Sequence, residues 1–163
     1  MPRIAVIEDD PTTSDQLAGW IRAAQPGLTV DQHFDRARAE GRGIVFLTPH
    51  LGCFEVTAQW YAQHYGPMTA LYSPPKSRLL RTLVAAGRQK PQLQLASPDL
   101  RGIRALLHAL REDKAIGILP DQAPGRGEGE WAEFFGRPAY TMTLVQRLAQ
   151  TSGAPILLAW AER

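Results

Sequence analysis

One short stretch of the chain combines residues that could do acid–base chemistry. Residues 47–55 read Leu-Thr-Pro-His-Leu-Gly-Cys-Phe-Glu, so His50 and Glu55 lie close together among small and turn-forming residues. A histidine held by a carboxylate can act as a general base and take the proton from a hydroxyl group. A hydroxyl activated in this way can attack a carbonyl carbon near neutral pH. The stretch therefore predicts a catalytic pair in which Glu55 orients His50 and stabilises its imidazolium form.

The elements around this stretch must place it at the edge of a sheet. Residues 44–47 form an uninterrupted apolar run, which is typical of a buried parallel strand, and His50 follows its carboxyl end. A second apolar run at 115–119 is followed by Asp121. In open α/β sheets, ligands bind at the carboxyl ends of the strands. If both strands are parallel, we expect His50 and Asp121 on the same rim.

The remaining sequence alternates strand-like apolar runs with stretches of helical spacing. The first 30 residues follow a strand, helix, strand order, which indicates parallel pairing. This alternation predicts an α/β fold with a mostly parallel central sheet and helices on both faces. Residues 124–129 are rich in glycine and proline and are expected to form a loop. Further strands are expected at 2–7, 28–30, 68–72, 92–96 and 154–160, and helices at 12–24, 35–40, 54–64, 78–88, 102–112 and 143–151.

The composition is typical of a globular protein in a reducing compartment. Of the 163 residues, 44% are hydrophobic and 21% are charged, which excludes a disordered chain. The single cysteine, Cys53, excludes an intramolecular disulfide. We expect no transmembrane helix, because no apolar run reaches about 18 residues, and no secretory signal peptide. No Cys/His set has metal-ligand spacing, so no metal and no cofactor is expected.

The net charge of +2 conceals a basic middle third. Such a surface could meet an acidic carrier protein, an anionic lipid head group or nucleic acid. For any one of these residues, a solvated helix face is the simpler interpretation. The basic residues concerned are Arg78, Arg81, Arg88, Lys90, Arg101, Arg104 and Arg111.

Five sequence blocks, in order from about residue 33 to 163, carry a family resemblance. They include His50-Leu-Gly-Cys-Phe-Glu55, Leu119-Pro-Asp-Gln122 and Phe134-Phe-Gly-Arg-Pro-Ala-Tyr-Thr141. Together the blocks resemble the lipid A biosynthesis lauroyl/myristoyl acyltransferases, within the wider group of acyltransferases with a His-x4-Asp/Glu motif. The other two blocks span residues 72–88 and 99–106.

The resemblance implies an enzyme that needs no cofactor. It would transfer a fatty acyl chain from an acyl carrier protein or coenzyme A thioester to a hydroxyl of a lipid A precursor. His50 would be the general base, and the acceptor hydroxyl would attack directly. An acyl-cysteine at Cys53 is the less favoured alternative, because this position is not a nucleophile in the family. The implied location is cytoplasmic, peripheral on the inner face of the inner membrane.

The resemblance also implies roles for further residues. Arg88 would stabilise the oxyanion or bind a phosphate, unless it is an ordinary helix-terminal arginine. Asp121 would orient Arg88 or the acceptor sugar, and its simpler interpretation is a turn residue. Gly52 would allow close approach of the carbonyl, and Arg78 would contact substrate.

An aromatic pair at the last block is the expected lining of the acyl slot. These residues are Phe134 and Phe135, although aromatic pairs belong more often to the plain core.

Residues 1–32 differ from the rest and resemble the start of a response-regulator receiver domain. The acidic cluster that includes Asp9 and Asp10 is the feature that would bind Mg²⁺ there, although capping of the next helix is the favoured interpretation. The phosphoacceptor position is taken by Thr48-Pro-His50. The chain is thus expected to combine a receiver-like segment, 1–32, with an acyltransferase-like core, 33–163. In the family that the chain resembles, a membrane-anchoring helix precedes the catalytic block, and the sequence continues past the last strand seen here. The alternatives are a signalling module and an inactive fusion of two α/β fragments.

Overall fold

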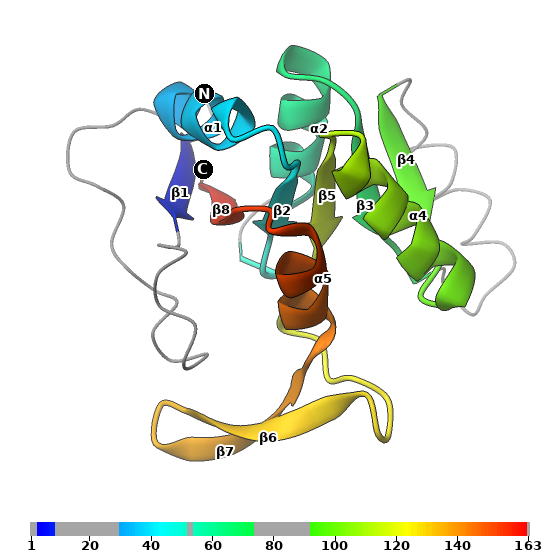
Figure 1. Cartoon of the computed structure of the whole chain (residues 1–163). Coiled ribbons are helices and arrows are strands. Elements are labelled where there is room, and N and C mark those ends of the chain that lie inside the picture. Colours follow the sequence, from blue (N-terminus) through cyan, green and yellow to red (C-terminus); the bar gives the residue numbers. More distant parts are fainter. Residues whose placement is uncertain (1–2, 9–29, 52–53, 74–91, 163) are drawn as a thin grey trace, which may run out of the picture.

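A six-stranded sheet forms the centre of the molecule (Figure 1). The computed structural model describes residues 3–8, 30–51, 54–73 and 92–162. The strand order is β1-β8-β2-β5-β3-β4, and every neighbouring pair is parallel except the antiparallel edge pair of β1 and β8. The strands of this sheet are β1 (Arg3–Glu8), β2 (Ile44–Leu47), β3 (Met68–Leu71), β4 (Leu93–Ala96), β5 (Ala115–Ile118) and β8 (Ile156–Glu162).

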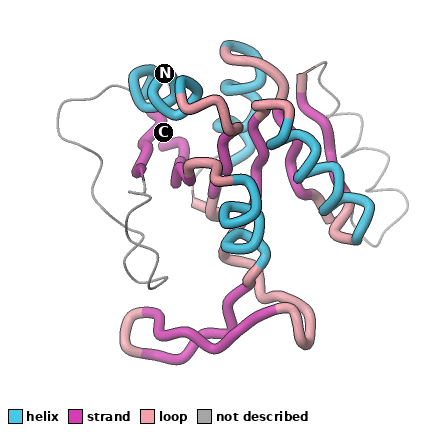
Figure 2. Tube along the Cα trace, viewed as in Figure 1, coloured by secondary structure: helices cyan, strands magenta, loops and turns pink. Residues whose placement is uncertain are grey.

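Helices cover both faces of the sheet (Figure 2). All four residues of the central strands β2 and β5 are buried, as the apolar runs predict. Side chains alternate between the faces, so Phe46 belongs to one core cluster and Val45 to the other. The described helices are α1 (Val30–Ala39), α2 (Phe54–His64), α4 (Leu100–Arg111) and α5 (Leu144–Ser152).

Each face has its own core. On the side of α1 and α2, the ring of Phe34 lies 5.2 Å from that of Phe46 and 5.4 Å from that of Tyr61. On the side of α4 and α5, Leu106 and Leu148 pack on the other face. Burying a side chain of this size stabilises the fold by about 1.5–3 kcal/mol. The two cores hold β2 and β5 rigidly, and these strands carry the candidate site.

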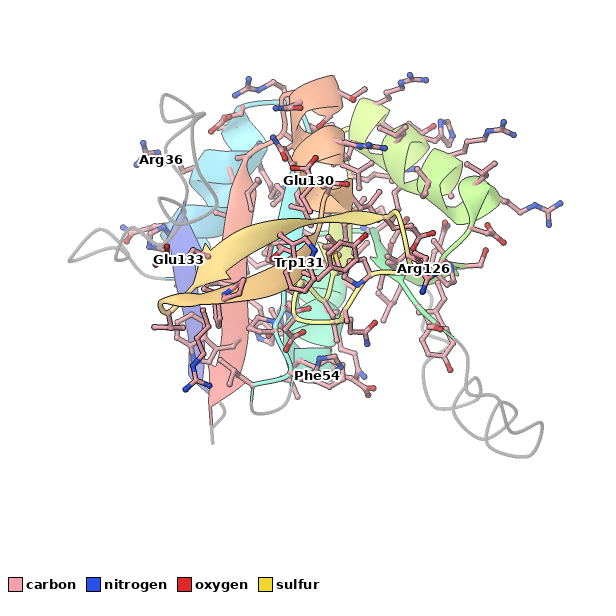
Figure 3. The ribbon with its side chains drawn as sticks, turned by 90° about the horizontal axis from the view of Figure 1, so that it is seen from below. Arg36, Phe54, Arg126, Glu130, Trp131 and Glu133 are labelled. Atoms are coloured by element: carbon pink, nitrogen blue, oxygen red, sulfur yellow. The ribbon has the colours of Figure 1, made fainter. Side chains whose placement is uncertain are left out.

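A separate β-hairpin, formed by the part of the chain between β5 and α5, projects from the sheet (Figure 1). It consists of β6 (Gly129–Phe134) and β7 (Arg137–Met142). Its two-residue turn has positive φ angles at Phe135 (50°) and Gly136 (73°), the pattern of a type I′ hairpin. Viewed from below in Figure 3, the ribbon crosses in front of the sheet, with Trp131 in its middle.

The predicted α/β architecture, a mostly parallel sheet between helices, is confirmed. Two local predictions were wrong, and one element was not predicted. The first strand was expected to pair in parallel, but it pairs antiparallel with β8 at the sheet edge. A strand, helix, strand order does not determine which edge of a sheet the strand joins. Residue 30 begins helix α1 and is not part of a strand. The hairpin was missed, because its half-exposed strands lack the apolar run of a buried strand.

Other predictions concern the chain ends and regions without a structural description. The predicted helices at 12–24 and 78–88 lie outside the described residues. Strand β1 joins the main sheet, while the division into segments 1–32 and 33–163 stays a prediction. In the described part of the chain, none of the helices has the length and apolar character needed to span a membrane.

Candidate active site

The side chains of His50 and Asp121 meet on one rim of the sheet, although they lie 71 positions apart. The Asp121 carboxylate accepts two hydrogen bonds from His50. One comes from the backbone N–H at 2.8 Å, and the other joins the ring Nδ1 at 2.9 Å. The pair forms because β2 and β5 are parallel neighbours in register, Leu47 with Ile118, so their carboxyl ends lie together. The predicted common rim is thus present.

This contact affects the charge of Asp121 and the tautomer of His50. Partial burial alone would raise the pKa of Asp121, but the hydrogen bonds from the backbone and ring of His50 hold that pKa below its ordinary value. Asp121 is therefore a carboxylate at neutral pH. A carboxylate at Nδ1 favours the tautomer that carries its proton there, which leaves Nε2 as the basic nitrogen. In this tautomer Nε2 is the nitrogen that can accept a proton.

The surroundings restrict the imidazole further. The ring of Phe54, at the start of α2, lies 4.9 Å from the His50 ring at an interplanar angle of 64°. A tight turn holds the backbone, since the N–H of Leu51 donates to the carbonyl of Pro49 at 2.6 Å. The side chain of His50 remains 43% exposed, which leaves room for a substrate hydroxyl to approach.

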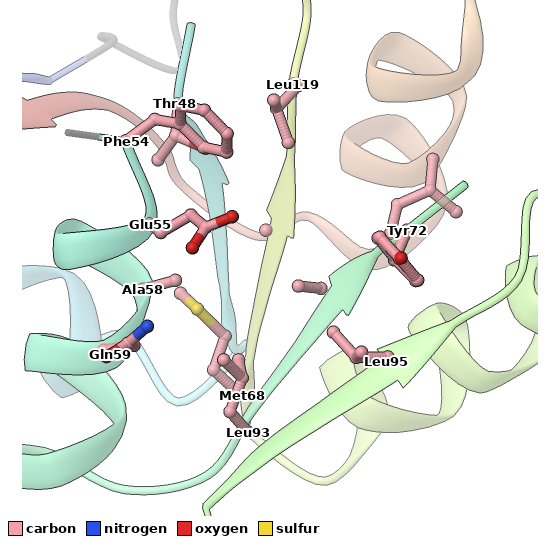
Figure 4. A pocket seen from close by; sticks show the side chains of 13 residues that line it. Thr48, Phe54, Glu55, Ala58, Gln59, Met68, Tyr72, Leu93, Leu95 and Leu119 are labelled. Carbon is pink, nitrogen blue, oxygen red and sulfur yellow. The ribbon is translucent and has the colours of Figure 1, made fainter. Parts of the chain in front are cut away.

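Glu55 lies in the first turn of α2 and lines a pocket beside this rim (Figure 4). We expected Glu55 to hold the His50 ring, whereas in the structure Asp121 bonds to Nδ1. Sequence reasoning placed Asp121 on the correct rim but assigned it to Arg88 or to the acceptor. The role of Glu55 as a partner of His50 stays a prediction.

The pocket extends from the rim that carries His50 and Asp121 along one face of the sheet. Its enclosed volume is about 70 Å³, and about 560 Å³ when the open solvent at its mouth is included. Thr48 and Leu119, at the carboxyl ends of β2 and β5, lie at the rim end, and Met68 and Leu93, at the amino ends of β3 and β4, lie at the other. The lining is mostly apolar, so the pocket suits a hydrocarbon chain. The lining residues are Thr48, Phe54, Glu55, Ala58, Gln59, Met68, Ala70, Leu71, Tyr72, Leu93, Leu95, Gly117 and Leu119.

Small residues create this space. Ala58 on α2 and Ala70 and Gly117 on the sheet all line the pocket, and larger side chains at these positions would take up its space. A Cβ added to Gly117 would lie 3.6 Å from the Met68 sulfur, an ordinary contact distance. Sequence reasoning did not single out these three residues, because alanine and glycine carry no chemical signal of their own.

The aromatic pair predicted to line an acyl slot lies elsewhere. Phe134 and Phe135 are at the hairpin end, 61% and 88% exposed, with ring centroids 4.6 Å apart. They do not belong to the lining of the described pocket. Since the hairpin projects from the sheet, its turn holds both rings on the surface.

Several predicted residues lie outside the described residues, namely Asp9, Asp10, Gly52, Cys53, Arg78 and Arg88. In the ranges that the structure does describe, no group of three or more His, Cys, Asp or Glu side chains could hold a metal ion.

Comparison with known proteins gives a family match and several relatives. A family model described as bacterial lipid A biosynthesis acyltransferase matches residues 9–161. The chain is 25% identical over 126 residues to a lipid A biosynthesis acyltransferase of Haemophilus influenzae, covering 77% of the chain and 39% of that protein. It is 28% identical over 123 residues to the lipid A biosynthesis palmitoleoyltransferase of Escherichia coli, covering 75% and 36%.

A third relative has a different acceptor in its name. The chain is 26% identical over 128 residues to a phosphatidylinositol mannoside acyltransferase of Mycobacterium tuberculosis, covering 77% of the chain and 40% of that protein. The chain thus spans well under half the length of each of these three relatives.

Proposed function

The chain belongs to the bacterial lipid A biosynthesis acyltransferase family, and on this premise we propose that it transfers a fatty acyl chain from a thioester to a hydroxyl group. The donor would be the thioester of an acyl carrier protein or of coenzyme A, and the acceptor a lipid A precursor. The observation that carries this proposal is the His50–Asp121 pair beside an apolar pocket on the same rim. The pair supplies a base and the pocket supplies a site for hydrocarbon.

The proposed reaction begins with proton transfer. His50 Nε2 takes the proton of the acceptor hydroxyl while the oxygen attacks the thioester carbonyl carbon. Asp121, bonded to Nδ1, stabilises the imidazolium that forms. When the tetrahedral intermediate collapses, the C–S bond breaks and the thiolate takes the proton back from Nε2. The products are an ester and a free thiol, with no protein nucleophile involved.

Two carboxylates flank this chemistry and we propose different roles for them. Asp121 positions His50 through its two hydrogen bonds. Glu55 projects from α2 into the lining of the pocket (Figure 4), and its proposed role is to contact the acceptor or the imidazolium. Arg88 would supply the oxyanion contact, as the sequence resemblance implies.

The acyl chain is proposed to lie in the pocket. Its reactive end would sit near Thr48 and Leu119 at the rim, and its tail would extend toward Met68 and Leu93. The acceptor, a lipid, would approach from the open side of the rim. We place the protein peripherally at the cytoplasmic face of the inner membrane, where such an acceptor is available.

The test is acyl transfer to a lipid A precursor by the full chain. We expect turnover from an acyl carrier protein thioester and loss of turnover in His50→Ala. A useful control is His64→Ala, because His64 is exposed in the last turn of α2, at the end of the helix away from His50, and its ring Nδ1 bonds to the backbone carbonyl of Trp60 at 2.8 Å. Absence of turnover in the unmodified chain would favour the inactive fusion. Phosphodonor-dependent labelling of an aspartate would favour the signalling module.

A further inference from the structure

A row of basic side chains runs along the exposed face of α4. Arg101, Arg104, His108 and Arg111 are all exposed. At about 100° per residue they fall within a sector of roughly 80° around the helix axis, and the row is about 15 Å long.

The other face of α4 fixes this helix on the sheet. Leu106, Ala109 and Leu110 are buried against the core. The Asp99 side chain caps the amino end by accepting from the N–H of Gly102 at 2.9 Å. The helix therefore presents its basic row on a rigid support.

The row has little compensating charge. Glu112 is the acidic residue at its carboxyl end, and it already pairs with His108 at 3.3 Å and with Lys114 at 2.5 Å. Within the described residues, Arg104 and Arg111 have no carboxylate at ion-pair distance. The surface is thus a linear positive feature suited to an acidic partner.

The row starts at the catalytic rim. Strand β4 is parallel to β3, which is parallel to β5, so their carboxyl ends share the edge that carries His50 and Asp121. Helix α4 begins shortly after β4 ends at Ala96, which places Arg101 and Arg104 nearest that edge. A partner bound along α4 would have one end beside the site.

We propose that the basic row of α4 is the docking surface for an acidic protein that delivers the acyl group as a thioester. This inference rests on the proposed function and specifies its donor. The row is one helix wide, which matches a single acidic helix of a partner. A bilayer is a poorer match, because a helix that lies on lipid needs an apolar face toward it. The apolar face of α4 is buried on the sheet, and Leu100 at its first position is its one large exposed apolar side chain.

The test compares two pairs of charge reversals in the full chain. Arg104→Glu with Arg111→Glu reverses the row and leaves Arg101, which contributes to the electrostatics of the Asp99 cap, in place. The matched control, Arg36→Glu with Arg147→Glu, makes the same change in net charge at exposed arginines of α1 and α5. Thermal melting of both variants checks folding, and Arg104→Gln with Arg111→Gln gives the neutral form of the same change.

We expect the α4 reversal to raise KM for an acyl carrier protein thioester about tenfold or more, while kcat and the KM for a coenzyme A thioester stay unchanged. The glutamine variant should show a smaller rise, and the control variant none. Direct binding of an acyl carrier protein, followed by fluorescence anisotropy, should weaken by the same factor and should also weaken with salt in the unmodified chain.

Equal binding of the carrier protein by the unmodified chain and the α4 variant would overturn the inference. An equal loss of carrier binding in the control variant would also overturn it. So would an α4 variant that still binds the carrier protein but no longer sediments with phosphatidylglycerol vesicles. The binding assay separates this inference from the proposed function. If the carrier binds through α4 but no thioester is turned over, the docking surface stands and the proposed activity fails. If coenzyme A thioesters react while the α4 substitutions leave carrier binding unchanged, the activity stands and the docking surface fails.

Discussion

The Asp121 carboxylate bonds to both the backbone N–H and the ring Nδ1 of His50, at 2.8 and 2.9 Å. One side chain thus fixes the position of the turn after β2 and the tautomer of the imidazole it carries. This double contact joins the ends of two neighbouring parallel strands, and it distinguishes Asp121 from an ordinary turn aspartate.

Replacing Asp121 by asparagine should keep the fold and lower kcat. The asparagine oxygen can still accept from the His50 backbone N–H, but its amide group would donate to Nδ1 and favour the wrong tautomer. We expect kcat to fall by about 10²–10⁴-fold with little change in melting temperature. Steady-state acyl transfer and thermal melting measure the two effects. Glu55→Gln is the companion variant, and a larger loss there than in Asp121→Asn would mean that Glu55 is the principal partner of His50.

The relation between the two carboxylates shows what the sequence could and could not predict. The apolar runs before His50 and Asp121 predicted two parallel strands and a shared rim, because strand burial and chain direction follow from local pattern. The choice between Asp121 and Glu55 depends on how α2 is rotated against the sheet, and no local pattern encodes that rotation. The hairpin was unpredictable for a related reason, since its strands β6 and β7 pair mainly with each other and bury little.

Two glycine-to-alanine substitutions should have opposite effects on stability. A Cβ at Gly102 would lie 1.7 Å from the backbone carbonyl oxygen of Ser97, which cannot move without distorting the start of α4. We expect Gly102→Ala to lower the free energy of unfolding by about 1–3 kcal/mol or more. At Gly117 the added Cβ makes only ordinary contacts, so Gly117→Ala should be neutral or stabilising by about 0.4–1 kcal/mol.

Urea unfolding of the two variants measures this difference. Similar destabilisation by both substitutions would contradict the packing described at Gly117. Because Gly117 also lines the pocket, its alanine variant should lose activity with the longest acyl donors first.

The hairpin turn should become more stable when Phe135 is replaced by asparagine. Phe135 has a φ of 50°, a conformation that asparagine before glycine adopts readily in type I′ turns. We expect the melting temperature to rise, by an amount that corresponds to about 1 kcal/mol in the free energy of unfolding. If Phe135 contacts substrate, as the sequence resemblance implies, the same variant should be less active. An unchanged or lower melting temperature would argue against the turn geometry.

Burial should make Tyr61 titrate late in alkali. Desolvation raises its pKa to about 12 from 10.0, with Arg38 opposing and Asp113 adding to the shift. A raised pKa means that the stability contributed by the neutral phenol is complete below pH 10 and is lost as the pH rises through about 12. Tyrosinate absorbance of the unmodified chain and of Tyr61→Phe should differ only at the end of the titration. A difference already present near pH 10 would show that the ring is hydrated.

The central claim is that His50 is the base of an acyl transfer reaction, and its most direct test is the rate of ester formation in His50→Ala. The substrates are an acyl carrier protein thioester and a lipid A precursor, with His64→Ala as the control. We predict that His50→Ala loses at least about 10²-fold in kcat, as removal of a general base does, while His64→Ala keeps the unmodified rate. Turnover that is unaffected by His50→Ala would contradict the account.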